Sequence, residues 1–319
     1  METKFESINC PLCGSHRNQP KFKAPDRFNL DSGIDYHIVI CLNCQFIYLN
    51  PRPMAEFISE FYTNGAYQPF LSTKASLNIW DIIYRWLRNY SVRWKRRKIE
   101  KLKTKGKILD IGCGTGEFLH EMKRHGWEVE GIEKDQRAAE FAQKEYGLKV
   151  STDDLNELTI LKKKFDIITM WHVLEHLFQP LDTLNIVKKI LEDDGFLLIA
   201  APNVVSFDAN FYRDNWVALD APRHLQHFVP KSLTVFSEAA ELEIFNFQQM
   251  PLDAFYNCLM SELLILTKYA KLKILQPFFL LRAIGIALIS IIKSSRYLNK
   301  KNRLGSSILY FIQKQRVEK

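Results

Sequence analysis

From residue 105 onward the chain alternates between short apolar runs and amphipathic stretches. KILDI, WEVEGIE, FDIITMW and GFLLIAAPN have the length and composition of buried strands. Between them, EFLHEMKRHG and DQRAAEFAQKEYG repeat apolar residues at helical spacing, and the second is bounded by Asp135 as N-cap and Gly147 after its end. PLDTLNIVKKILEDD predicts another helix. Repeated β-α units of this kind predict an α/β, Rossmann-like fold: a parallel sheet with helices on both faces.

The pattern continues toward the C-terminus with one interruption. ELEIFNFQQM predicts a sixth strand, and GSSILYFIQKQ predicts a last strand that closes the sheet. Between them lies an apolar insert, residues 255–302, with the runs FYNCLMSELLILTKYA and PFFLLRAIGIALISII. As a helix the second run would be ~24 Å long, shorter than the ~30 Å hydrocarbon core of a bilayer, so we do not expect it to span a membrane.

Basic residues follow the second apolar run: Lys293, Arg296, Lys300, Lys301 and Arg303. An apolar helix pair with a basic flank is suited to lie on an anionic membrane surface as a peripheral contact. A helical hairpin that is buried against the domain, or in a dimer interface, has the same pattern. The sequence leaves both interpretations open.

The first fifty residues contain two C-x-x-C pairs, Cys10 with Cys13 and Cys41 with Cys44. The segment METKFESINCPLCG lacks the apolar core of a signal peptide, which favours a cytoplasmic location, where paired cysteines bind metal more often than they form disulfides. Four thiolates at this spacing predict a closed, structural zinc site with no open position for chemistry. Four buried cysteines without metal are the alternative.

Residues 51–104 are rich in aromatic residues and then in cations. Trp80, Tyr84, Leu87 and Trp94 recur near helical spacing, which predicts a helix that docks on the main domain and could roof its pocket. The net charge of +8 is concentrated here: from Arg85 to Lys107 there are eleven Lys or Arg and one acid. This basic segment favours an anionic neighbour, although a solvated helix face has the same composition.

The stretch ILDIGCGTGEFL carries three glycines at alternate positions after a predicted strand. A dinucleotide turn reads G-x-G-x-x-G, but here Glu117 stands at the third glycine's place and Gly116 comes one residue early. Asp110 precedes the turn, where a carboxylate suits a cationic ligand better than a pyrophosphate. The motif D-x-G-x-G-x-G resembles the S-adenosylmethionine turn of class I methyltransferases.

This resemblance implies a set of cofactor-binding residues. The turn would hold the amino-acid part of S-adenosylmethionine, Glu133 the ribose hydroxyls, Asp153 or Asp154 the adenine amine, and Leu155 the face of the ring. The implied set is Asp110, Gly112, Cys113, Gly114, Gly116, Glu133, Asp153, Asp154, Leu155 and Trp171.

The resemblance extends over most of residues 1–250. FDIITMWHVLEHLFQP is similar to the fourth-strand segment of small-molecule methyltransferases, while CLNCQFIYLNPRP and NWVALDAPRHLQHF resemble a bacterial subgroup with an N-terminal zinc-binding element, associated with cell-surface polysaccharide synthesis. It implies a sugar or lipid-linked glycan precursor as substrate, and a cytoplasmic enzyme that could sit on the inner face of the membrane. The expected division is a zinc ribbon (1–50), a helical linker or lid (51–104), the S-adenosylmethionine-binding domain (105–254 and 303–319) and the hydrophobic helical insert (255–302).

Methyl transfer from a sulfonium mainly needs alignment of the reacting atoms, but a hydroxyl or acidic-carbon acceptor also needs a base. His172 ends the fourth predicted strand and His224 lies in the loop after the fifth, so we predict these two as catalytic. His176 and His227 more often tie a loop to the sheet. In HVLEH, His172, Glu175 and His176 share one helical face, and ubiquinone-pathway O-methyltransferases, which are similar here, are associated with a divalent metal near this stretch.

Two other functions remain open from the sequence alone. An RNA methyltransferase would use the cysteine pairs and the basic segment as its nucleic-acid surface, although MWHVLEH lacks the N-P-P-[YF] signature of amino-group methylation. A non-catalytic scaffold could keep the fold for membrane or partner binding. The intact turn with Asp110, Gly112, Gly114 and Glu133 argues against that scaffold.

Overall fold

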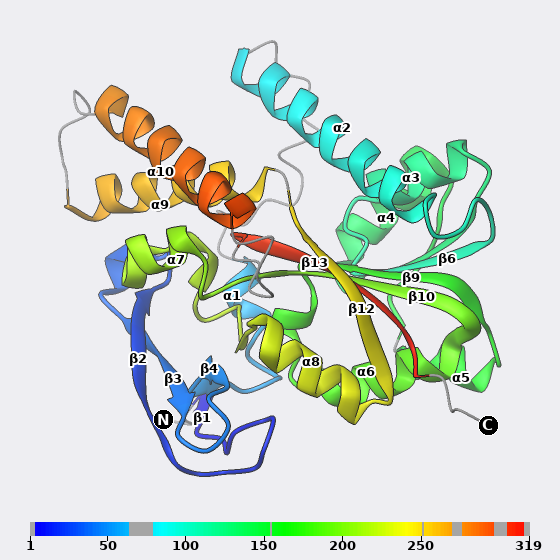
Figure 1. The fold of residues 1–319 in the computed structure, drawn as a ribbon, viewed down its shortest axis with the longest axis horizontal. Helices are drawn as coiled ribbons and strands as arrows, with labels where there is room; N and C mark the ends of the chain where they lie inside the picture. The colour runs from blue at the N-terminus through cyan, green and yellow to red at the C-terminus, as the bar shows by residue number, and fades with distance from the viewer. Residues whose placement is uncertain are drawn as a thin grey trace.

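The computed structural model describes residues 4–63, 79–153, 155–250, 252–269, 276–296 and 305–315. Its centre is a seven-stranded sheet in the order β12-β13-β10-β9-β6-β7-β8 (Figure 1). The strands are β6 (Lys107–Ile111), β7 (Glu128–Ile132), β8 (Lys149–Ser151), β9 (Phe165–Trp171), β10 (Leu191–Pro202), β12 (Leu242–Gln249) and β13 (Ser307–Lys314).

Strands β6 to β10 run parallel, which confirms the α/β fold predicted from the sequence. The predicted last strand, β13, completes the sheet from within: it lies between β10 and β12 and pairs antiparallel with both. The order reverses at β6, whose neighbours are β7 and β9. In open α/β sheets the ligand crevice lies at the carboxyl ends of the strands at such a reversal, which here is the glycine turn.

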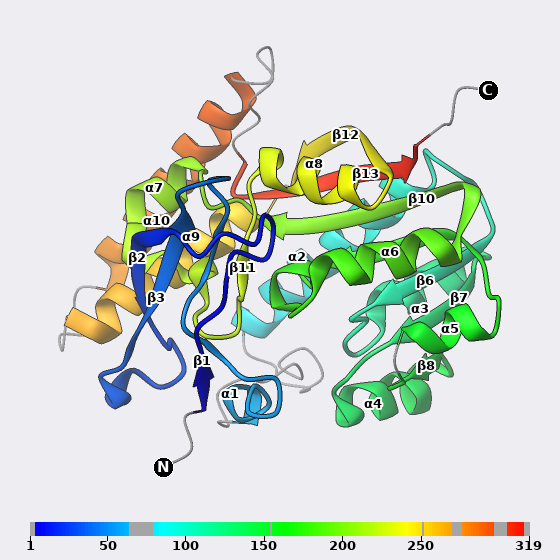
Figure 2. The ribbon, with the colours of Figure 1, turned by 90° about the horizontal axis from the view of Figure 1, so that it is seen from below.

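Helices cover both faces of this sheet (Figures 1 and 2). One face carries α2 (Ile79–Ile99), α3 (Glu117–Arg124) and α4 (Gln136–Tyr146), and the other carries α5 (Asn156–Ile160), α6 (Pro180–Ile190) and α8 (Pro230–Ala239). The carboxylate of Asp135 accepts the N–H groups of residues 137 and 138, which confirms the predicted N-cap of α4. Helix α6 is shorter than predicted, because Leu191 turns to extended backbone and pairs with Phe165.

The cysteine-rich N-terminus is built into the main domain. Strands β2 (Asn18–Pro25), β3 (Asp35–Cys41) and β4 (Ile47–Leu49) form one sheet with β11 (Gln226–His227), and β1 (Phe5–Glu6) pairs with β5 (Arg52–Pro53) ahead of α1 (Glu60–Thr63). The ring of Phe46 lies 5.7 Å from that of Phe228 and 5.1 Å from that of Phe236. A shared apolar core therefore joins residues that are 180 positions or more apart in the chain.

The apolar insert forms an antiparallel hairpin of α9 (Asp253–Tyr269) and α10 (Gln276–Arg296), packed on α7 (Phe207–Tyr212). Figures 1 and 2 show it beside the N-terminal strands at one end of the sheet. Arg282 of α10 pairs with the buried Glu262 of α9 at 2.6 Å, and the Tyr212 hydroxyl donates to Glu262 at 2.8 Å. Within the described part of the chain, no helix has both the length and the apolarity needed to cross a membrane.

Candidate active site

The glycine turn joins β6 to α3 and lies tightly against its neighbours. Gly112, Gly114 and Gly116 all have positive φ, where side chains are rarely accommodated. A Cβ on Gly112 would stand 2.5 Å from the Val173 side chain, and one on Gly116 would stand 2.8 Å from that of Ala142. The backbone can pass here only because these positions are glycine.

Two carboxylates flank the turn. Asp110 at the end of β6 is 2% exposed and accepts the Thr169 hydroxyl at 2.5 Å. Burial raises the pKa of Asp110 to about 7, although the Thr169 hydrogen bond opposes the shift. Glu133 follows β7 and accepts the N–H of Gly114 at 2.7 Å and that of Asp135 at 2.9 Å. The structure therefore places an acid on each side of the turn, as a cationic cofactor with a ribose would need.

The other residues that the resemblance assigns to the cofactor lie around this turn, and they differ in how deeply they are buried. Trp171 ends β9 and meets the ring of Phe118 edge-on at 5.3 Å. Leu155 caps α5 and packs against the core, whereas Asp153 is exposed. Cys113 is buried, and burial raises its pKa. Asp154 lies outside the described residues, and the contact of Asp153 with an adenine stays a prediction.

Helix α2 covers the glycine turn with its basic residues. Arg88 pairs with Glu117 at 2.5 Å and donates to the Thr115 hydroxyl at 3.3 Å. The amine of Lys95 lies 4.3 Å from the centre of the Trp171 ring, and burial lowers its pKa. Sequence reasoning missed Lys95, because it was one of eleven cations in a run.

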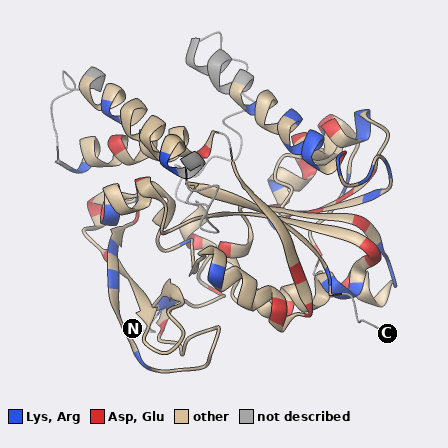
Figure 3. Cartoon of the chain, viewed as in Figure 1, with Lys and Arg blue, Asp and Glu red and all other residues tan. Residues whose placement is uncertain are grey.

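Several cations of the basic segment are held by acids of the same domain. Arg96 bridges Glu100 and Glu121 at 2.6 and 3.0 Å, and Lys103 bridges Asp166 and Asp194 at 2.8 and 2.9 Å. Figure 3 shows acidic positions on α3 among the basic ones of α2 and α3. These pairs favour a helix face that packs on the domain over a free nucleic-acid surface. The side chains of Trp80, Tyr84 and Arg85 lie outside the described residues.

The four N-terminal cysteines converge. Their sulfur atoms all lie within 4.8 Å of one another, with Cys10 to Cys44 at 3.5 Å and Cys13 to Cys41 at 3.6 Å. Ligands around tetrahedral zinc, with Zn–S near 2.3 Å, stand about 3.8 Å apart. Burial raises the pKa of Cys10 and that of Cys44, the latter to about 11, whereas hydrogen bonds from Ser15 and Asn43 outweigh burial and lower the pKa of Cys13 to about 6, so the spacing of the four sulfur atoms carries the argument. The donor set therefore fits a zinc ion.

A cavity of about 280 Å³ opens at the carboxyl ends of β9 and β10. The cavity is lined by side chains from the N-terminal module (residues 5–53, strands β1 to β5), the residue after β9, the loop before β11, and α9, among them Arg27, His172, Asp220, His224, Asp253 and Asn257. The cavity therefore lies beside the glycine turn, at the end of the sheet where a methyl acceptor would meet the cofactor.

His172 has positive φ and stands between two acids. Its Nε2 lies 3.1 Å from Asp253, and its Nδ1 lies 3.4 Å from Glu175. Although burial opposes the charge, the ion pairs with Asp253 and Glu175 raise the pKa of His172 to about 10. In this pairing the ring carries two protons and can donate but not accept. The predicted role of His172 as a base therefore requires the ion pair with Asp253 to open.

The His224 ring is neutral, in contrast to the protonated ring of His172. Its Nδ1 donates to the carbonyl of Ala218 at 2.8 Å, and its Nε2 lies 3.9 Å from Asp220. Burial lowers the pKa of His224 to about 4, and the neighbouring His176 adds to the effect, so the His224 ring is neutral at pH 7. The cavity thus presents one protonated and one unprotonated imidazole.

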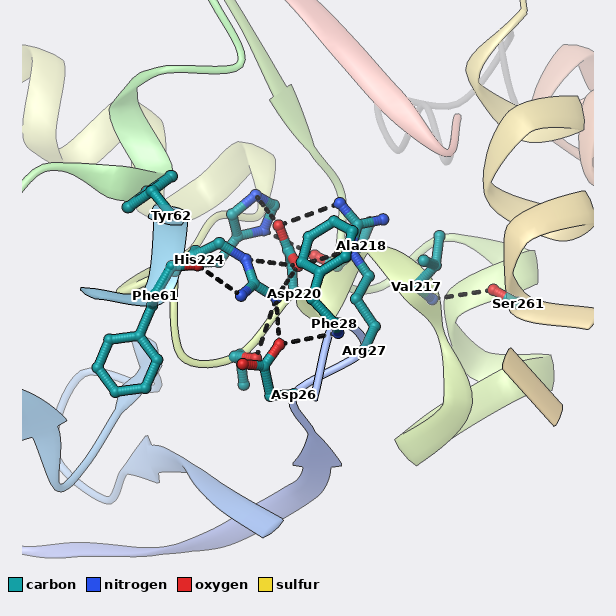
Figure 4. A network of polar contacts seen from close by, with 12 residues as sticks. Asp26, Arg27, Phe28, Phe61, Tyr62, Val217, Ala218, Asp220, His224 and Ser261 are labelled. Carbon is teal, nitrogen blue, oxygen red and sulfur yellow. Dashed lines mark hydrogen bonds and ion pairs between the residues drawn. The ribbon is translucent and has the colours of Figure 1, made fainter. Parts of the chain in front are cut away.

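An ion network fixes the loop that carries His224 (Figure 4). The buried Arg223 guanidinium contacts Asp26 at 2.9 Å and Asp220 at 2.7 Å, and Arg27 reaches Asp220 at 2.8 Å. Asp26 and Arg27 belong to the N-terminal module. That module therefore helps to hold one wall of the cavity.

The remaining two histidines lie behind this wall. Nδ1 of His176 lies 3.1 Å from the carbonyl oxygen of Arg223 and 2.9 Å from the Tyr62 hydroxyl. His227 belongs to β11, and burial lowers its pKa to about 3. His176 thus ties its loop to α1 and to the loop before β11, whereas the buried Nε2 of His227 has no hydrogen-bond partner among the described residues.

Sequence reasoning did not anticipate Asp253, Arg27 or Asp220 in this cavity. Asp253 follows His172 by 81 positions and opens an apolar helix, where an acid is also a common helix-start residue. Arg27 lies in a segment that we assigned only to the zinc ribbon. Asp220 could have been found, because it directly precedes the motif APRHLQHF, which we had already placed beside the substrate.

Known proteins support a family assignment. Residues 84–246, just over half of the chain, match the family described as a methyltransferase domain. The chain is 35% identical over 107 residues to the "Ubiquinone biosynthesis O-methyltransferase" of Actinobacillus pleuropneumoniae serotype 5b (strain L20), covering 30% of this chain and 46% of that protein. The chain is 25% identical over 158 residues to the protein of the same name from Coxiella burnetii (strain Dugway 5J108-111), covering 46% of this chain and 67% of that protein. The chain spans about half the length of the first of these relatives.

A solved structure agrees in fold. Magnesium protoporphyrin IX methyltransferase (ChlM) from Synechocystis PCC 6803 with bound SAH superposes with a TM-score of 0.50 at 10% identity, covering 82% of this chain and 100% of that one. Identity this low bears on the fold alone. Because the family match runs unbroken from α2 to β12 across the whole glycine turn, the chain belongs to the methyltransferase domain family of class I S-adenosylmethionine-dependent enzymes.

Proposed function

We propose that the chain transfers the methyl group of S-adenosylmethionine to a hydroxyl oxygen of a small molecule held in the cavity of about 280 Å³. The observation that carries this proposal is the position of His172, which directly follows β9 beside the glycine turn and also lines the cavity. Asp110 would face the cofactor's cationic end and Glu133 its ribose. Methyl transfer would then need mainly alignment.

The acceptor class follows from the relatives. Those reported above carry the name of ubiquinone biosynthesis O-methyltransferases, which favours a ring hydroxyl as the acceptor. These names argue against the sugar or glycan precursor predicted from the sequence, and the proposal does not include it. The RNA alternative is disfavoured by the acids that engage Arg88, Arg96 and Lys103.

His172 and His224 are the side chains proposed to act on the acceptor. His172 is held as a cation between Asp253 and Glu175, so it would donate a hydrogen bond to an acceptor oxygen once one of these two pairs opens. His224 faces the cavity unprotonated, but a base works best with a pKa near the operating pH, and its pKa of about 4 is far below that. His224 alone would therefore be a weak proton acceptor.

Calorimetric titration with S-adenosylmethionine, followed by transfer of its labelled methyl group to a panel of phenols and catechols, tests the proposal. We expect binding and label on at least one ring hydroxyl, and loss of both in Gly114→Arg. Gly114 has φ +55, so a substitution strains the turn itself. The control Gly285→Ala lies in a helix where a Cβ meets nothing within 4 Å. Label on RNA, or binding without transfer to any hydroxyl, would contradict the proposal.

We also propose that the N-terminal cysteines bind a structural zinc ion. All four positions of a tetrahedral site would be filled by Cys10, Cys13, Cys41 and Cys44, so the ion would fix the β2–β4 module and take no part in the reaction. The N–H of Asn43 points at Cys41 Sγ at 3.4 Å, as around metal-bound thiolates.

Peripheral membrane contact through the α9–α10 hairpin is the third part of the proposal. Its outer surface exposes apolar side chains from both helices: Tyr256, Leu259, Leu263, Phe278, Leu280, Leu281, Ile284, Leu288, Ile289 and Ile292. Figure 3 shows few charged positions on the hairpin. Residues 255–302 contain eight Lys or Arg and one acid, which suits an anionic lipid surface. Among these cations, Lys271, Lys273, Lys300 and Lys301 lie outside the described residues.

Sedimentation with vesicles tests this contact. We expect the chain to bind vesicles with anionic lipid more strongly than purely zwitterionic ones, and Leu281→Glu to reduce the bound fraction. Leu281 is 70% exposed, and the control Leu161→Glu changes a leucine that is 62% exposed on α5's side of the molecule. Equal binding by both variants, or no binding by the unmodified chain, would contradict the membrane contact.

A further inference from the structure

Arg27 lines the cavity of about 280 Å³ and has hydrogen-bond donors left over for a ligand. It lies in the loop between β2 and β3, and its side chain is only 18% exposed. Its Nη2 donates to Asp220 at 3.3 Å, while its Nε faces the same carboxylate at 2.8 Å without hydrogen-bond alignment. Among the described residues, Nη1 has no hydrogen-bond partner, so its two N–H groups remain available.

The neighbours of this guanidinium hold it in place. The ring of Phe28 lies 4.6 Å from Cζ of Arg27 and 4.5 Å from Cζ of Arg223, and Figure 4 shows Phe28 and Arg27 beside Asp220. Although burial opposes it, Arg27 and Arg223 hold the pKa of Asp220 well below its usual range, so this carboxylate stays ionised and keeps orienting Arg27. A donor that is already oriented loses little conformational entropy when it binds a ligand.

Arg223 has the structural role in this pair of arginines. It donates to Oδ1 of Asp220 from Nε at 3.1 Å and from Nη2 at 2.7 Å, and it also contacts Asp26 at 2.9 Å. Its side chain is fully buried, so it does not reach the cavity. Asp220 therefore has a full partner behind the wall, and Arg27 is a second cation that faces the cavity.

The acids that line the cavity are paired with cations. Asp253 lies 3.1 Å from Nε2 of His172, and Asp220 is shared by the two arginines. The ring of His224 is neutral at pH 7. Among the described lining residues, an arriving anion therefore meets no unpaired carboxylate. The proposed cofactor favours an anion further, because S-adenosylmethionine carries a sulfonium and an ammonium against one carboxylate and is a net cation.

We propose that Arg27 forms an oxyanion subsite in this cavity, so that the methyl acceptor is a hydroxylated ring that also carries a carboxylate. The free end of the guanidinium would donate charge-assisted hydrogen bonds to that carboxylate. A phosphate has nearly twice the charge and would call for a second cation with free donors. His172, the other cation on the wall, already has an acid at each ring nitrogen.

The subsite deepens the proposed methyl transfer and rests on it. Arg27 lies outside residues 84–246, which match the methyltransferase family, so the subsite is a feature that the N-terminal module adds to the domain. The module would then select the acceptor as well as support the cavity wall. An acceptor held at Arg27 leaves its ring hydroxyl to be presented at the His172 side of the same cavity.

A pair of matched acceptors tests the subsite. Methyl transfer is measured to a dihydroxybenzoate and to the dihydroxybenzamide with the same ring hydroxyls, which has no charge. In Arg27→Gln we expect the ratio of kcat/KM for the acid over the amide to fall by roughly 10- to 100-fold, mainly through KM of the acid. Arg27→Lys keeps the charge without the planar fork and should give an intermediate ratio. Affinity for S-adenosylmethionine should be unchanged in both variants.

The matched control is Arg17→Gln. Arg17 is an exposed arginine of the same module that is not among the residues lining the cavity, and its variant should keep the ratio of the unmodified chain. Because acid and amide are compared within one protein, a partial loss of folded chain lowers both rates alike and leaves the ratio intact. An unchanged ratio in Arg27→Gln, or a preference of the unmodified chain for the amide or for a ring phosphate, would overturn the proposal.

Calorimetry separates this inference from the proposed function. The acid and the amide are each titrated into the full chain saturated with S-adenosylhomocysteine, which cannot donate a methyl group. Tighter binding of the acid without methyl transfer from S-adenosylmethionine would refute only the proposed function. Transfer to both acceptors with equal affinity would refute only the subsite, and binding of neither would also count against the subsite.

Discussion

Truncation of Arg223 to alanine should destabilise the whole fold and not only the loop that carries it. The guanidinium is fully buried and is shared by Asp26 of the N-terminal module and Asp220 of the cavity wall. It also donates to the carbonyl of Phe61 in α1 at 3.3 Å. Without it, two buried carboxylates face each other with one cation fewer. Removing one partner of a buried ion pair costs about 3–5 kcal/mol.

The matched control is Arg137→Ala. Arg137 pairs with Asp135 at 3.2 Å, but its side chain is 68% exposed, and such surface pairs contribute about 0–1 kcal/mol. Urea unfolding followed by circular dichroism gives both free energies of unfolding. We expect a loss of about 3–5 kcal/mol for Arg223→Ala and less than about 1 kcal/mol for the control. Equal losses for the two variants would refute the reasoning. Adding Asp26→Asn to Arg223→Ala should recover part of the loss, because it removes an uncompensated charge.

Three further predictions concern the turn and the cysteines. Because burial places the pKa of Asp110 at about 7, affinity for the cationic cofactor should fall as the pH drops from 8 to 6, and calorimetry on Asp110→Asn should show a weaker, flatter pH dependence. Gly112→Ala should lower the free energy of unfolding by more than ~1 kcal/mol, since φ is +71 and the new Cβ meets Val173 at 2.5 Å; a loss within urea-melt error would contradict this. Cys13→Ser should remove the zinc found by elemental analysis, whereas Asp110→Asn should retain it; zinc that persists in Cys13→Ser would argue against the four-cysteine site.

Local signals allowed much of the sheet to be predicted. The strand β9, the capped helix α4 and the glycine turn each depend on residues close together in the chain, and each is where the pattern placed it. The end of α6 was wrong, because LEDD continues the helical pattern and only the pairing of Leu191 with Phe165 makes it extended. Such pairing depends on tertiary structure that periodicity does not encode.

Long-range contacts explain what the sequence did not reveal about the site. Strand β4 pairs with β11 almost 180 residues later, so the cysteine module became part of the cavity wall instead of a separate ribbon. The charge states of His172 and His224 depend on Asp253 and on Ala218. A histidine's position in a motif shows that chemistry is available there. Its protonation is set by neighbours that the motif does not contain.

Transfer of labelled methyl groups to a fractionated lysate tests the central claim most directly. The full chain is incubated with methyl-labelled S-adenosylmethionine and the extract, which is then separated into small molecules soluble in organic solvent, nucleotide sugars, RNA and protein. The account predicts label in small hydroxylated molecules of the organic fraction, and no label with Gly114→Arg. Label confined to RNA, to nucleotide sugars or to protein, or equal labelling by that variant, would contradict it.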